Sequence, residues 1–207
     1  EMPLIILQKD IKIYNKKIKQ ILELYKIKGF VLSNVSDYFL IEKYKEKYEF
    51  IGNYTLNIFN VNACNVIKNI GIDVITPSIE LSNIERIKLI EKCNIKCEEI
   101  VYGDIPLINM KYCIKDNKTI CDKENNKCYS IIDINNLKEY KCEMGTNPIL
   151  SKIYGSKKIS IEKHAKESSA RIFIHNENIK EINNIVENIC KGKYFLGSNY
   201  KNDIIVK

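Results

Sequence analysis

Arginine is nearly absent from this chain of 207 residues, because Arg86 and Arg171 are its only two. The 33 lysines and arginines outnumber the 26 acidic residues, and the formal net charge is +7. Surfaces that read phosphates usually rely on arginine, whose planar guanidinium forms bidentate hydrogen bonds. The positive charge is therefore compatible with an RNA partner, although a solvated lysine surface explains it more simply.

Long apolar stretches are missing as well. No run approaches the roughly 20 apolar residues that a helix needs to cross a bilayer, so no membrane partner is expected. Residues 1–7 read as an internal strand rather than a charged leader before an apolar run, which predicts a cytoplasmic protein. Eight cysteines without a secretion signal favour metal ligands over a disulfide scaffold.

Motifs of common enzyme chemistries are also absent. The chain has no phosphate-binding glycine loop, no dinucleotide-binding fingerprint and no zinc-protease helix motif. His164 and His175 have no serine, cysteine or glutamate partner at a recognisable catalytic spacing. If the protein is a peptidase, its catalytic residues therefore form no motif that can be recognised in the sequence.

What the sequence does contain, up to Tyr112, is an alternation of short apolar runs with amphipathic helical patterns. We expect strands at 4–7, 30–32, 50–53 or 55–59, 74–76 and 100–102, and helices at 11–25, 37–44, 63–70 and 84–90. Ser82 and Glu85 have the spacing of a capping box before the last helix. The alternation predicts an α/β fold with a parallel sheet. Five strands suit an open sheet or the later strands of a partial (β/α) TIM-type barrel, and the beginning on a strand favours the barrel.

The pattern changes after Tyr112, where residues 115–127 are polar and lose periodicity. Beyond them we expect a hairpin from 129–134 and 139–142, a helix over 161–168, a strand at 171–174 and a final helix over 179–189. We therefore assign 1–112 to barrel units, and 113–207 to a cysteine-bearing loop, hairpin and C-terminal α/β extension of the same domain.

Four cysteines, Cys113, Cys121, Cys128 and Cys142, lie close together in the sequence around this loop and hairpin. Four thiolates can coordinate an iron–sulfur cluster or a zinc ion. No two of the four are separated by only two residues, which argues against a zinc ribbon. Reduced structural thiols are the alternative interpretation. The other cysteines are interpreted as small buried apolar residues: Cys64, Cys93, Cys97 and Cys190.

Several segments, in order, resemble the collagenase-like U-32 peptidase family. They are Gly-Phe-Val-Leu-Ser-Asn at 29–34, Tyr-Thr-Leu-Asn-Ile-Phe-Asn at 54–60, Ile-Thr-Pro-Ser-Ile-Glu-Leu at 75–81, Ile-Val-Tyr-Gly-Asp-Ile-Pro-Leu at 100–107 followed by Tyr112-Cys113, and Ile-Tyr-Gly-Ser at 153–156. Arg171 and Glu177 also stand where that family tends to have Arg and Glu. Each segment alone is a weak indication of the family. The specific indication is that all of them occur in the same order as in that family.

The resemblance implies an incomplete eight-stranded barrel whose other half is an N-terminal half-barrel, in cis or in trans. It also implies a four-iron, four-sulfur cluster on Cys113, Cys121, Cys128 and Cys142, with zinc as the alternative. The implied activity is that of an oxygen-independent hydroxylase acting on RNA pyrimidines. A peptidase and a non-catalytic half-barrel that needs a partner chain are the two other readings.

Barrel enzymes place their chemistry at the carboxyl ends of the strands. Asn57, Glu80 and Tyr102 fall at or near such ends and are the candidate catalytic residues. Each also has a structural interpretation. Asn57 can be a turn residue, Glu80 can favour a helix start by its charge, and Tyr102 can be a core residue with a satisfied hydroxyl.

Overall fold

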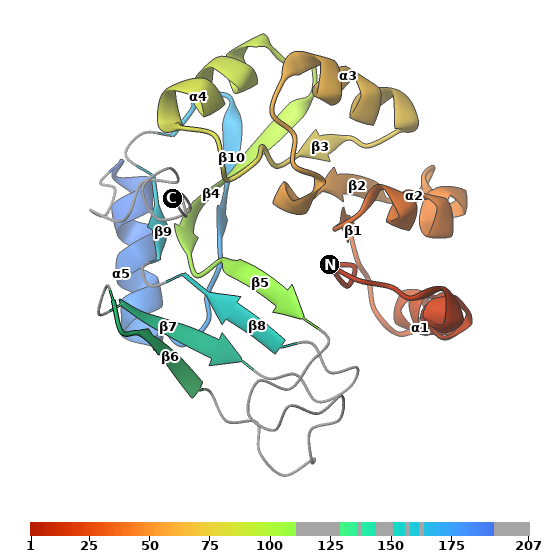
Figure 1. Ribbon diagram of the computed structural model, residues 1–207. Helices are drawn as coiled ribbons and strands as arrows, with labels where there is room; N and C mark the ends of the chain where they lie inside the picture. The colour runs from red at the N-terminus through yellow and green to blue at the C-terminus, as the bar shows by residue number, and fades with distance from the viewer. Residues whose placement is uncertain (111–128, 136–137, 144–150, 156–157, 162–163, 193–207) are drawn as a thin grey trace. The chain divides into compact units, whose positions relative to one another are not determined.

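The computed structural model describes residues 1–110, 129–135, 138–143, 151–155, 158–161 and 164–192 (Figure 1). The chain forms two compact units. Unit 1 comprises Glu1–Glu99 and His164–Arg171, and unit 2 comprises Ile100–Lys163 and Ile172–Lys207. This division does not test the predicted domain ranges 1–112 and 113–207, which remain a prediction. In the described part of the chain, no helix has the length and apolar character needed to cross a membrane.

Unit 1 alternates strands with helices. In chain order its elements are η1 (Gln8–Asp10), α1 (Ile11–Leu24), β1 (Gly29–Leu32), α2 (Val35–Ile41), η2 (Glu42–Tyr44), β2 (Glu49–Gly52), η3 (Tyr54–Leu56), α3 (Val61–Ile70), β3 (Val74–Ile75), α4 (Asn83–Lys92) and the beginning of β4 (Lys96–Gly103). Strands β1, β2, β3 and β4 pair in this order, and every pair is parallel. The predicted α/β class with a parallel sheet is therefore confirmed.

The register aligns the carboxyl ends of β1, β2 and β3 at one edge of the sheet, and β4 continues beyond them. Phe30 pairs with Phe50, and Ile75 pairs with Cys97. Beyond the strands, Asn53 N–H donates to the Leu32 carbonyl at 2.8 Å and Thr76 N–H donates to the Gly52 carbonyl at 2.8 Å. The backbone positions of Asn53 and Thr76, which directly follow β2 and β3, are therefore fixed by hydrogen bonds that continue the strand pairing.

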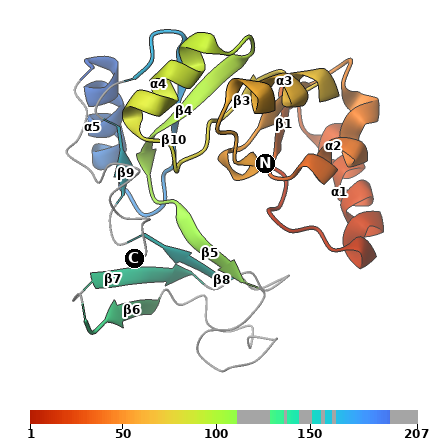
Figure 2. The ribbon, with the colours of Figure 1, turned by 45° about the horizontal axis from the view of Figure 1, so that its top comes forward.

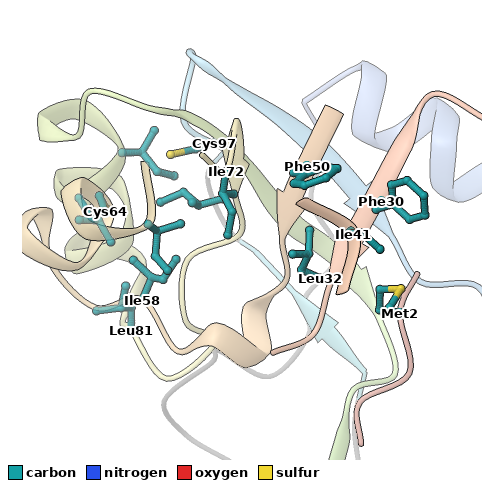
Figure 3. Close-up of a cluster of buried hydrophobic side chains, with 14 of the residues drawn as sticks. Met2, Phe30, Leu32, Ile41, Phe50, Ile58, Cys64, Ile72, Leu81 and Cys97 are labelled. Carbon is teal, nitrogen blue, oxygen red and sulfur yellow. The ribbon is translucent and has the colours of Figure 1, made fainter. Parts of the chain in front are cut away.

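The core of unit 1 lies on the helix-covered face of this sheet (Figure 3). Phe50 is fully buried, and its ring meets that of Phe30 edge to face at 5.9 Å. Burying a side chain of this size contributes about 2 to 3 kcal/mol. Because side chains alternate along a strand, Val31 and Ile51 point to the opposite face, where they are only half-buried.

Local signals begin and end the helices of unit 1. The predicted capping box at α4 is confirmed, with reciprocal hydrogen bonds between Ser82 and Glu85. Asn34 caps α2 in the same way with Asp37. Gly71 ends α3 with a φ of 109°, a conformation that only glycine adopts without strain.

Unit 2 contains a four-stranded antiparallel sheet. Its elements are the end of β4, β5 (Pro106–Met110), β6 (Tyr129–Asp133), β7 (Lys138–Glu143), β8 (Ser151–Tyr154), β9 (Ile159–Ser160), the end of β10 (Ser168–Ile172) and α5 (Ile179–Cys190). The sheet order is β5-β8-β7-β6, and β9 pairs antiparallel with the end of β4 (Figure 2). The predicted hairpin is confirmed as β6 and β7, with Tyr129 opposite Cys142.

Two sequence predictions about elements, the strand at 4–7 and the helix over 161–168, were wrong. Residues 4–7 form no strand, because only Met2 N–H reaches β1, donating to the Val31 carbonyl at 2.7 Å. Of the two alternatives for the third strand, 50–53 corresponds to β2, whereas at 55–59 the chain turns through η3. In the described part of 161–168 there is no helix. Instead, Ala165 N–H donates to the distant carboxylate of Glu99 at 2.8 Å, and Ser168 begins β10.

Candidate functional site

Polar side chains of unit 1 meet at the carboxyl edge of the parallel sheet. Asn53 follows β2 and Thr76 follows β3, and each is 1% exposed. Thr76 Oγ1 donates to Glu98 Oε1 in β4 at 2.9 Å. Arg171 of β10 donates to Asn53 Oδ1 at 2.8 Å and forms an ion pair with Glu98. We call these four residues, Asn53, Thr76, Glu98 and Arg171, the edge cluster.

The amino terminus of the described chain adds to the edge cluster. Asn53 Nδ2 donates to Glu1 Oε1 at 2.9 Å, and Asn53 Oδ1 also accepts from Tyr54 N–H at 2.9 Å. Burial and the charge of Glu1 raise the pKa of Tyr54 to about 12, although Arg171 opposes the shift. The Tyr54 phenol therefore stays protonated at neutral pH, and it is a hydrogen-bonding group rather than a base.

The edge cluster holds a guanidinium in one orientation. The Arg171 side chain is 14% exposed, and both Asn53 and Glu98 hold its donors. Carboxyl ends of parallel strands are where α/β proteins bind ligands. An arginine fixed in this way is suited to a phosphate or carboxylate oxygen, because its planar donors are already oriented.

The candidates Asn57 and Glu80 meet around one buried hydroxyl in unit 1. Ser78, fully buried, donates from Oγ to Asn57 Oδ1 at 2.6 Å and accepts from Glu80 N–H at 3.2 Å. Asn57 has a left-handed φ of 55°, and the side chains of Asn57 and Glu80 are exposed. The contacts give Asn57 a turn-stabilising role and leave both side chains accessible to a ligand.

The carboxylate of Glu99, the residue after Glu98, contacts a serine and a histidine of unit 1. Ser168 Oγ lies 3.1 Å from His164 Nε2 and also donates to Glu99, while His164 Nε2 lies 3.2 Å from Glu99 Oε2. In a serine-peptidase relay, the acid and the serine contact different ring nitrogens of the histidine. Here both contact Nε2, so the trio is no such relay. Glu99 instead forms a fully buried ion pair with Arg86.

The candidate Tyr102 belongs to unit 2, where it contacts a partly buried ion pair. Its hydroxyl donates to Glu177 Oε1 at 3.1 Å, and Glu177 is paired with Lys158. Burial alone would raise the pKa of Glu177, but Lys158 and backbone N–H groups outweigh it and lower the pKa to about 2. Burial is also the main cause that raises the pKa of Tyr102, so its hydroxyl is a donor at neutral pH.

A histidine continues this network of unit 2. His175 Nδ1 lies 3.6 Å from Asp104 Oδ2, and His175 Nε2 lies 3.8 Å from Glu143 Oε2. The His175 ring packs on Tyr154 with centroids 4.7 Å apart, and the Tyr154 hydroxyl donates to Glu143 at 2.5 Å. His175 therefore lies between the carboxylates of Asp104 and Glu143.

Of the predicted cluster ligands, Cys142 alone lies in the described part. Cys113, Cys121 and Cys128 lie outside the described residues. Cys142 is 1% exposed in β7, and its sulfur donates one long hydrogen bond, of 3.8 Å, to the Tyr140 carbonyl. Among the residues that the structure describes, no three His, Cys, Asp or Glu side chains could together hold a metal ion.

Comparisons of the chain with protein-family models, with curated proteins and with solved structures gave no match. The site is therefore interpreted from its own geometry. Sequence reasoning missed Asn53, Thr76 and Glu98. One signal for the first two was available, because each is the polar residue that ends an apolar strand pattern. Glu98 had no such signal, because it lies within β4.

Proposed function

We propose that this chain is the later part of a (β/α) TIM-type barrel resembling the collagenase-like U-32 peptidase family. In this proposal it is the iron–sulfur-binding component of an oxygen-independent hydroxylase that acts on RNA pyrimidines. One observation carries the proposal: Cys142 is buried in β7 opposite Tyr129, and Cys128 directly precedes Tyr129 in the sequence. Cys142 is therefore paired in the sheet with the residue that follows Cys128 in the sequence.

The donor chemistry of these cysteines fits an iron–sulfur cluster. Cys113, Cys121, Cys128 and Cys142 would hold a four-iron, four-sulfur cluster through their thiolates. Cys142 suits this role because its sulfur is shielded from water on a regular strand and bonded only weakly to a carbonyl. When bound, such a cluster supplies the electron-transfer chemistry that protein side chains lack. The same thiolates would also suit zinc, so a metal analysis is needed to separate the two.

The edge cluster supports an anionic substrate such as RNA. Arg171 is held by Glu98 and Asn53 at the edge where barrel enzymes bind substrates. Its guanidinium would bind a phosphate and so position the nucleotide, without taking part in the chemistry. Exposed Asn57 and Glu80 near the same strand ends remain the candidates for contacts with the base, and Tyr102 remains a candidate hydrogen-bond donor.

The half-buried face of the sheet opposite the helices supports the incomplete barrel. Val31 and Ile51 lie on the face opposite the helices and are only half-buried. Strand faces of a closed barrel are filled by side chains from all strands. An N-terminal half-barrel, in cis or in trans, would complete this packing.

Analysis of RNA in the natural host tests the function with every partner present. The gene is deleted and then complemented with the wild type, with Cys142→Ala or with the surface variant Cys190→Ala. RNA nucleosides are measured by mass spectrometry. We expect one hydroxylated pyrimidine to disappear on deletion and to return with the wild type and Cys190→Ala only. An unchanged nucleoside profile would refute the hydroxylase. Gelatin cleavage by the purified chain that survives Cys142→Ala would favour the peptidase.

A further inference from the structure

Two cysteines that the sequence analysis treated as separate apolar residues meet in unit 1. Cys93 is the C-cap of α4, and Cys97 is the second residue of β4. Between them the chain bends at Asn94 and Ile95, which turns the two side chains toward each other. Their sulfur atoms lie 3.2 Å apart, and both also contact the Ile95 carbonyl, at 3.6 Å and 3.5 Å.

The two thiols differ in their access to solvent. Cys97 is 4% exposed and packs in the core beside Ile72 (Figure 3), whereas Cys93 is half-buried. Cys93 lines a surface pocket of about 610 Å³. The wall of the pocket includes three lysines, Lys45, Lys68 and Lys96, and two acidic residues, Asp73 and Glu167. A reagent can therefore reach Cys93 from a pocket with a net positive wall, whereas Cys97 is almost fully buried.

We propose that Cys93 and Cys97 form a thiol–disulfide exchange site that takes a small disulfide carrying carboxylates. The Cys93 thiolate attacks one sulfur of the small disulfide, so a mixed disulfide forms and one small thiolate leaves. Cys97 then gives its proton to the small thiolate that has left, and the Cys97 thiolate attacks Cys93 Sγ, so the mixed disulfide breaks and the second small thiolate leaves. Two protein thiols are thereby oxidised to one disulfide, and one small disulfide is reduced to two thiols.

The surroundings of the pair fit these roles. Attack requires a sulfur that the reagent can reach, which is the position of Cys93. Burial raises the pKa of the Cys97 thiol, which disfavours its thiolate and leaves the first attack to Cys93. Closing the bond needs only a shift of about 1 Å, because a disulfide joins its sulfurs at about 2.05 Å. Cys64, fully buried on α3, also interacts with Cys93.

Peptide mapping tests the site directly, because trypsin cleaves after Lys92 and after Lys96. The full chain is equilibrated with mixtures of reduced and oxidised glutathione, alkylated and digested. We expect peptide 93–96 joined to peptide 97–111 by a disulfide. Cys97→Ala should keep glutathione on Cys93, whereas Cys93→Ala should show no glutathione on Cys97. Cys64→Ala should behave as the wild type, and exposed Cys190 should carry glutathione without forming this link.

Two results would overturn the proposal. One is that peptides 93–96 and 97–111 remain unlinked at every glutathione ratio while Cys190 is modified. The other is that Cys93 pairs with Cys64 instead. A matching circular dichroism spectrum for each alanine variant shows that it is folded, so that the loss of the link reports the loss of the thiol. The experiment does not involve the four predicted cluster ligands, and its outcome is independent of the iron–sulfur proposal.

Discussion

Arg171 and Glu98 form an ion pair that joins β10 to β4 at the carboxyl edge of the parallel sheet. The two side chains are 14% and 12% exposed, so each charge depends largely on the other for compensation. Asn53 orients the same guanidinium at 2.8 Å. This pair is a structural element of the edge cluster, and it carries the proposed contact with a phosphate.

Arg171→Gln should therefore reduce stability and RNA binding together. We expect the free energy of unfolding to fall by about 2 kcal/mol, because Glu98 loses its partner in a mostly buried position. Lys166→Gln removes the same charge from an exposed side chain and should change stability by less than about 0.5 kcal/mol. Urea unfolding and RNA-binding titrations at two salt concentrations measure both effects. Equal RNA affinities for the two variants would contradict the assignment of Arg171.

The buried pair of Arg86 and Glu99 predicts a different pattern. Both residues are 1% exposed, and Glu99 also accepts from Ala165 N–H. Arg86→Met alone should destabilise unit 1 by about 3 to 5 kcal/mol, because it leaves a buried charge unpaired. The double variant Arg86→Met, Glu99→Gln should recover part of this loss. Urea unfolding of the two single variants and the double variant measures the coupling, and additive losses would contradict it.

The Glu177 carboxylate of unit 2 predicts a dependence on pH. Its pKa of about 2 lies below the ordinary value near 4.3, so its ionised form stabilises the fold at pH above that ordinary value. This contribution is lost as the pH falls from about 4.3 toward 2. Glu177→Gln should cost about 2 kcal/mol at pH 7, and the difference from the wild type should vanish near pH 2.

Glu187→Gln is the matched control for this titration. It removes a carboxylate from α5 whose side chain is 62% exposed. Unfolding curves from pH 2 to pH 7 should therefore coincide with those of the wild type within about 0.5 kcal/mol. A constant difference between Glu177→Gln and the wild type across this range would show that Glu177 acts by packing instead of by charge.

Two substitutions of Asn57 distinguish the contribution of its backbone conformation to stability from that of its side chain. Asn57→Ala places alanine at a φ of 55° and removes the hydrogen bond from Ser78, which should cost about 2 kcal/mol together. Asn57→Gly removes only the hydrogen bond and should cost about 1 kcal/mol. Thermal unfolding measures both. If glycine were as costly as alanine, the left-handed backbone would not contribute.

Helices, caps and strands whose sequence pattern lies within a single segment could be predicted from the sequence. The helix over 11–25 appeared as α1 because its apolar spacing is local, and the Ser82–Glu85 capping box needs only four residues. The strand at 30–32 appeared as β1. The parallel sheet followed from the alternation of such segments.

Features that depend on distant partners could not be predicted. Arg171 and Asn53 are 118 residues apart in the sequence, and no local pattern joins them. The segment 161–168 has a helical spacing, but the Glu99 carboxylate fixes Ala165 and Ser168 outside a helix. The apolar run 4–7 lacks a ladder partner, and apolar content alone does not make a strand. The proximity of Cys93 and Cys97 depends on the bend between them, which their spacing does not reveal.

The most direct test of the account is the iron and acid-labile sulfide content of the chain after anaerobic purification. It should be measured for the wild type, for Cys113→Ala, Cys121→Ala, Cys128→Ala and Cys142→Ala, and for the control Cys190→Ala. The account predicts about four iron and four sulfide per chain in the wild type and the control, and loss of the cluster in each of the four variants. Zinc in place of iron, or no iron and sulfide after reconstitution, would contradict it.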